Sequence, residues 1–165
     1  MDDFLSSSNN QLSPFLEACY NNDISKVTEY LDKGEDIHSK AISGSTPLHI
    51  AAQSGFLELA ILLIKKGADV NFLNDDGWTP LHFAAMKGYV DIANVLIKAG
   101  VDINIPGKRY NRTALHYASD QGKSEVIELL LKSGANKNLK DISGKTALEI
   151  ATKKGFSSVI DLLSK

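Results

Sequence analysis

A tetrapeptide that begins with threonine returns along the chain at an almost constant interval. It occurs as Thr46-Pro47-Leu48-His49, Thr79-Pro80-Leu81-His82, Thr113-Ala114-Leu115-His116 and Thr146-Ala147-Leu148-Glu149. The intervals are 33, 34 and 33 residues, and one more interval back along the chain lies Ser13-Pro14-Phe15-Leu16. A repeat of this length is typical of a solenoid, in which each unit is one supersecondary motif that packs only against its neighbours. The sequence therefore predicts five stacked units.

The sequence of each unit predicts two short helices joined by a tight turn. Thr46 suits the N-cap of the first helix, and Pro47 suits its first position, where a missing N–H costs nothing. Gly55 suits the left-handed residue that ends this helix. A second, amphipathic helix is predicted over 56–66, and Gly67 closes it. The residues that lead to the next threonine are turn formers.

This pattern resembles the ankyrin repeat over about nine-tenths of the chain. The resemblance implies an all-α solenoid of helix-turn-helix units with β-hairpin-like loops and a concave binding face. We predict a flexible leader over 1–11, rich in Ser and Asn, and a single repeat domain over 12–165. The expected units are 12–40, 41–73, 74–106, 107–140 and 141–165, of which the first and last depart from the pattern and are interpreted as caps.

The composition excludes several classes of protein. The chain has 165 residues, a net charge of −2 and one cysteine, Cys19, so it has neither an intramolecular disulfide framework nor a multi-cysteine zinc site. The acidic start lacks the features of a signal peptide. The longest apolar run, 59–64, is far shorter than the roughly 20 residues of a membrane span. We expect a soluble cytoplasmic or nuclear monomer, with neither membrane nor nucleic acid as partner.

The residues that could carry chemistry have structural interpretations. His49, His82 and His116 lie one per unit, and stacked helices about 8–10 Å apart keep them from converging on one metal ion. We expect each to bridge its threonine cap to nearby backbone. His38 is expected to be solvated, and Cys19 to act as a small buried hydrophobe. The glycines form no phosphate-binding cluster. No enzyme activity, cofactor or metal is predicted.

The resemblance places partner contacts at the hairpin tips and on the exposed side of the first helices. The candidates carried over in this way are Trp78, Tyr110, Arg112, Arg109, Asp75, Asp76, Met86, Lys87, Asp120 and Lys145. Trp, Tyr and Arg dominate binding hot spots, and the chain's one Trp and both its Arg residues lie in two adjacent hairpins. The second of these hairpins has one extra residue, with Asn111 at the position of a glycine, so we expect it to have its own shape; a neutral insertion is the alternative.

Two further features concern charge and modification. Residues 1–74 carry 5 Lys and 10 Asp or Glu, whereas residues 108–165 carry 11 Lys or Arg and 6 Asp or Glu. This uneven distribution of charge would steer a partner whose charges are arranged in the opposite order, or would merely keep the two ends soluble. Ankyrin domains of this kind are often substrates of an asparagine hydroxylase, and the resemblance extends this modification to Asn71 and Asn104, each preceded by a suitably placed Leu and Asp.

The function predicted from the sequence is a non-enzymatic module that binds another protein through its concave face and hairpin tips. Such a module would serve as a scaffold, an inhibitor or an assembly chaperone. The alternative is an ankyrin fragment of a larger protein, such as a channel, a kinase or a microbial effector, whose activity lies outside this chain.

Overall fold

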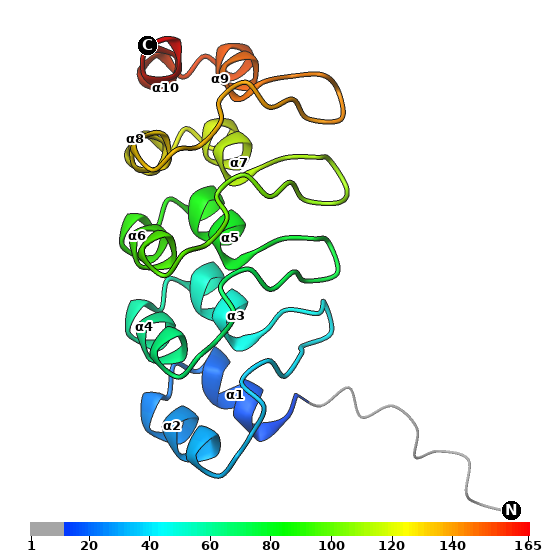
Figure 1. The fold of residues 1–165 in the computed structure, drawn as a ribbon, viewed down its shortest axis with the longest axis vertical. Coiled ribbons are helices and arrows are strands. Elements are labelled where there is room, and N and C mark those ends of the chain that lie inside the picture. The colour runs from blue at the N-terminus through cyan, green and yellow to red at the C-terminus, as the bar shows by residue number, and fades with distance from the viewer. Residues whose placement is uncertain (1–11) are drawn as a thin grey trace, which may run out of the picture.

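The computed structural model describes residues 12–165 as a stack of helix pairs (Figure 1). The helices in this range are α1 (Pro14–Tyr20), α2 (Ile24–Asp32), α3 (Pro47–Ser54), α4 (Leu57–Lys65), α5 (Pro80–Lys87), α6 (Val90–Lys98), α7 (Ala114–Asp120), α8 (Ser124–Lys132), α9 (Ala147–Lys154) and α10 (Ser157–Ser164). Odd-numbered helices form one layer and even-numbered helices a second, while the hairpin loops project from the odd-numbered layer. The predicted all-α solenoid is confirmed, and the predicted leader lies outside the described residues.

The start and end of each first helix follow the local chemistry of the sequence. Thr46 is the N-cap of α3, and its side chain and that of His49 form a capping box. Pro47 occupies the first turn. Gly55 ends the helix with φ of +82°, a left-handed conformation that a residue with a side chain adopts only with strain. The expected cap, proline and glycine positions are therefore confirmed in α3.

Pairs of small residues allow the first helices to approach closely. The pairs Ala18-Cys19, Ala51-Ala52, Ala84-Ala85 and Ala118-Ser119 are almost completely inaccessible to solvent. The second helices add larger side chains to the same core, including Leu59, Leu63, Leu96 and Leu130, all fully buried. Each such leucine contributes about 1.5–3 kcal/mol through burial. Since one unit cannot cover these side chains alone, the stability of each unit depends on its neighbours.

Cys19 takes part in this core, and burial raises the pKa of its thiol to about 12. The reactive thiolate is then on the order of 1000-fold scarcer than for an exposed cysteine. We expect Ellman's reagent to label native protein at pH 8 at least about 100-fold more slowly than urea-unfolded protein. Equal rates in the two samples would contradict the buried position.

Backbone hydrogen bonds connect successive hairpins into a continuous edge. Asp75 N donates to Ser43 O at 3.1 Å, Lys108 N to Asp76 O at 2.9 Å, and Ile142 N to Tyr110 O at 2.9 Å. Gly44 at the tip has φ of +69°, in the left-handed region that favours glycine, and a Cβ there would also meet the carboxylate of Asp75. The hairpins thus stack on one another in the same order as the helices (Figure 1).

The hairpin with the extra residue keeps these connections. Its closing bond runs from Gly107 N to Arg112 O, so it encloses one more residue than the bond from Asn74 N to Trp78 O in the preceding hairpin. Asn111 has φ of +51°, as predicted for a substitute of glycine, and its side-chain amide donates to Lys140 O at 2.9 Å. The extra residue widens the turn and leaves its contacts with both neighbours in place.

In the part of the chain that the structure describes, no helix has the length and apolar character needed to cross a membrane.

Candidate functional site

The three repeated histidines tie each unit to the next. The backbone N–H of Thr79 donates to His82 Nδ1 at 3.0 Å, so this nitrogen carries no proton. The proton therefore lies on Nε2, which donates to Arg112 O of the following unit at 3.3 Å. His49 repeats the arrangement with Trp78 O at 2.9 Å. The predicted bridge from threonine cap to neighbouring backbone is confirmed, and it explains why these side chains are histidine.

Burial keeps these imidazoles neutral. Desolvation lowers the pKa of His82 to about 4, and it also lowers the pKa values of His49 and His116. A protonated ring would place a hydrogen on Nδ1, opposite a backbone N–H that can only donate. Among residues 12–165 there is no group of three or more His, Cys, Asp or Glu side chains arranged to hold a metal ion.

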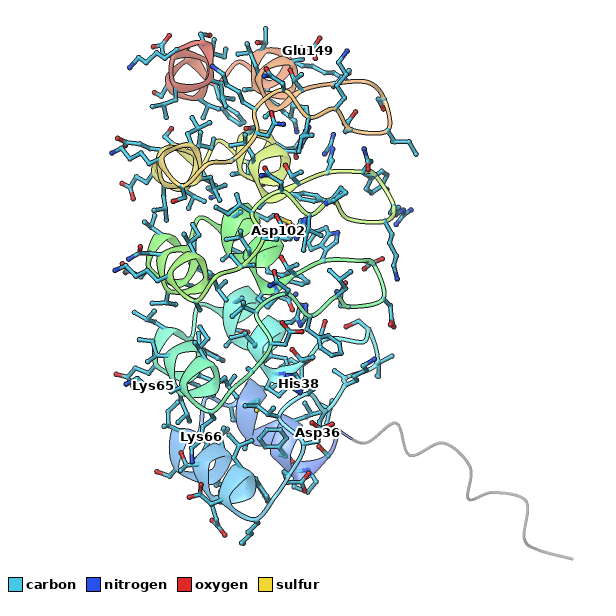
Figure 2. The ribbon with its side chains drawn as sticks, viewed as in Figure 1. Asp36, His38, Lys65, Lys66, Asp102 and Glu149 are labelled. Carbon is cyan, nitrogen blue, oxygen red and sulfur yellow. The ribbon has the colours of Figure 1, made fainter. Side chains whose placement is uncertain are left out.

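His38 differs from the prediction that it would be solvated. Its Nε2 accepts the backbone N–H of Asp69 at 3.0 Å, and its ring stacks on Phe72 with centroids 5.6 Å apart. Figure 2 shows it beside Asp36, whose carboxylate accepts the backbone N–H of His38 at 2.9 Å. The prediction was wrong because the hydrogen-bond partner of His38 lies 31 residues away, in the next unit, where local sequence does not reveal it.

Asparagines fill the equivalent position in the following units. Asn71 Oδ1 accepts Asp102 N at 2.7 Å, and Asn104 Oδ1 accepts Asn136 N at 2.8 Å. Figure 2 labels Asp102 on this ladder of loop residues. Both asparagine side chains therefore join neighbouring units, and their hydroxylation stays a prediction.

Trp78 lies within an aromatic cluster instead of standing at a hairpin tip. Its ring centroid is 4.5 Å from that of Tyr117, 4.9 Å from Phe83 and 5.9 Å from His82. A Cβ on Gly107 would lie 2.9 Å from the indole, so the following hairpin rests directly against the ring. Trp78 is half-buried and fills the space between two hairpins and helices α5 and α7.

Arg112 is held within the stack by two carboxylates. Its Nε lies 3.2 Å from Asp141 Oδ2, and Nη1 lies 3.8 Å from Asp120 Oδ1. The guanidinium carbon is 6.0 Å from the centroid of the Tyr117 ring. Lys154 completes the network, 3.6 Å from Asp120. The side chain of Arg112 is only 25% exposed, so this arginine joins units four and five.

Asp141 is the buried member of this network. Its Oδ1 accepts the backbone N–H groups of Ser143 and Lys145 at 2.8 and 3.0 Å. Burial by itself would raise the pKa of this carboxyl group. The two backbone bonds and Arg112 outweigh that effect and hold the pKa below its ordinary value.

A family model described as "Ankyrin repeats (3 copies)" matches residues 15–107 and again residues 106–165. The chain belongs to the ankyrin repeat family. Ankyrin repeats are generally modules that bind other proteins. A search of curated proteins finds no significant match.

The ankyrin stack separates the predicted contact residues into two groups. Trp78, Arg112, Met86, Asp120 and Lys145 are half-buried, and Trp78, Arg112 and Asp120 are engaged as described above. Those exposed to solvent are Asp75, Asp76, Lys87, Arg109 and Tyr110. Sequence reasoning missed Phe83 and Tyr117, which support Trp78. The available signal was their shared position, since each directly follows a repeated histidine.

Proposed function

We propose that this ankyrin repeat chain binds another protein through its concave face and the hairpins of units three and four. The observation that carries the proposal is the placement of Tyr110. Its side chain is 43% exposed, with the Arg109 guanidinium 5.0 Å above its ring, on the same hairpin that packs against Trp78. An exposed aromatic ring and arginine on a rigid support are typical of a binding hot spot.

The role that fits this surface is that of a scaffold, an inhibitor or an assembly chaperone, because each acts by holding a second protein. The same binding is expected if the ankyrin stack works as one module of a larger protein.

We expect wild-type protein to capture one main partner from native lysate, and the triple variant Trp78→Ala, Tyr110→Ala, Arg112→Ala to lose it. Mass spectrometry of the two captured sets identifies the partner. Because Trp78 and Arg112 also support the hairpins, the double variant Arg109→Ala, Tyr110→Ala tests the exposed side chains alone. It should weaken the recovered partner's binding at least about tenfold.

A matched control removes an exposed apolar side chain from another hairpin. Ile42 is 73% exposed at the tip in unit two, and Ile42→Ala should leave capture unchanged. Circular dichroism must show the same helix content in all variants. Undiminished capture by both the triple and the double variant would discard this surface.

A further inference from the structure

The last two hairpins and the residues that flank them carry four cations that form no ion pair within residues 12–165. They are Lys108 and Arg109 in unit four, and Lys140 and Lys145 in unit five. Across residues 12–165 the ion pairs formed by lysine and arginine involve other side chains. Three of the four are exposed, and Lys145 is half-buried.

The acidic side chains of hairpin five and of helices α7 and α9 are already engaged within the stack. Asp141 binds Arg112 and two backbone N–H groups, and Asp120 lies between Arg112 and Lys154. Glu149, labelled in Figure 2, accepts Thr146 N at 2.7 Å and the Thr146 hydroxyl at 3.0 Å. Glu149 is close to Lys140 and Lys145, but this single carboxylate cannot neutralise four cations.

The sign of the charge changes between hairpins three and four. Asp75 and Asp76 are exposed in hairpin three, and the backbone N–H of Lys108 in hairpin four donates to Asp76 O. Positive charge therefore begins at hairpin four and continues through hairpin five. This local change matches the polarity of the whole chain.

Two exposed apolar side chains accompany the cations. Tyr110 is 43% exposed and Ile142 is 70% exposed, and the hydrogen bond from Ile142 N to Tyr110 O places them on adjacent tips. Only five large apolar side chains are more than 40% exposed in residues 12–165, and these two lie on adjacent tips. Cations around an apolar centre complement a ligand that carries carboxylates beside apolar groups.

We propose that this surface docks an acidic segment of a partner protein, in which Asp or Glu side chains flank apolar ones. The surface consists of Lys108, Arg109, Tyr110, Lys140, Ile142 and Lys145, and we name it the basic tip surface. The inference rests on the proposed function and defines the chemistry of the partner. The cations attract and orient the segment, while Tyr110 and Ile142 bury its apolar side chains.

Fluorescence anisotropy with defined peptides tests this inference. The probe is a labelled peptide of about a dozen residues composed of Glu, Leu and Ser, and its match has Gln in place of every Glu. We expect the acidic peptide to bind at least about tenfold more tightly than its neutral match in low salt, and its affinity to fall as salt is added. Equal affinities, or no binding by the acidic peptide at about millimolar protein, would overturn the inference.

Variants locate the contact on the protein. We expect Arg109→Ala with Lys140→Ala, and separately Tyr110→Ala with Ile142→Ala, each to weaken the acidic peptide about tenfold. The control, Lys65→Ala with Lys98→Ala, removes the same charge from exposed positions on α4 and α6, away from the hairpins (Figure 2 labels Lys65), and should have no effect. An equal loss in the control would reduce the effect to net charge and overturn the inference.

Two competing ligands are included in the same experiment. If a single-stranded oligonucleotide binds more tightly than the acidic peptide, the ligand of this surface is a phosphate backbone and not an acidic protein segment. If analytical ultracentrifugation shows salt-sensitive self-association that Arg109→Ala with Lys140→Ala abolishes, the ligand of this surface is the acidic end of a second copy of the chain. If the partner captured from lysate depends on Tyr110 but not on Arg109 or Lys140, the proposed function stands and this inference fails.

Discussion

Acidification from pH 7 to pH 5 is expected to lower the free energy of unfolding by at least about 2 kcal/mol. The pKa of His82 falls from 6.5 in an unfolded chain to about 4 in the stack, because burial disfavours the charged ring. Between these values the unfolded chain binds a proton that the folded chain does not, so stability is lost as the pH falls. His82 alone accounts for about 2 kcal/mol at pH 5, and His49 and His116 act in the same direction.

Urea denaturation followed by circular dichroism at several pH values from 7 to 5 measures this loss. Since the carboxyl groups with lowered pKa, such as Asp141, act mainly below this window, the histidines dominate within it. In the variant His82→Gln, the difference in stability between pH 7 and pH 5 should shrink by about 2 kcal/mol, whatever the variant's stability at pH 7. An unchanged difference would show that protonation of His82 in the unfolded chain does not cause the loss of stability.

The parts of the fold predicted correctly depend on residues close together in the sequence. Thr46 caps a helix that begins at the next residue, and Gly55 ends the same helix with the backbone conformation that its lack of a side chain permits. Asn111 shows the same local logic at a turn. Repetition then extends these local results along the chain, because each unit meets a neighbour of the same kind.

The parts that the sequence did not reveal depend on contacts between units. His38 bonds to Asp69 in the next unit, and Arg112 pairs with Asp141 in the next hairpin. A residue type that is common in binding hot spots gives no information about a carboxylate 29 positions further along the chain. Arg112 was therefore predicted for its chemistry alone, whereas its partners hold it within the stack. The division of the candidate surface into engaged and exposed side chains needed the structure.

Replacing Asp141 by alanine is expected to lower the free energy of unfolding by about 3 kcal/mol. The substitution leaves the N–H groups of Ser143 and Lys145 without their acceptor, and it leaves Arg112 without its shortest ion pair. Unpartnered polar groups at a buried site carry the cost of desolvation, which exceeds the net gain of the bonds themselves. Because repeats contact only their neighbours, the loss should appear first as faster amide hydrogen exchange in α9 and α10, with α3 and α4 unaffected.

The variant Asp141→Asn separates the backbone bonds from the ion pair. The chain contains its own precedent, since Asn74 occupies the equivalent position and its Oδ1 accepts Trp78 N at 2.9 Å. Asparagine should keep the turn closed and lose only the attraction to Arg112, at a cost of about 1 kcal/mol. Equal losses for the alanine and asparagine variants would assign the whole effect to the ion pair with Arg112. A double-mutant cycle with Arg112→Leu would then measure the interaction energy of that pair. An alanine variant as stable as wild type would show that hairpin five closes without this carboxylate.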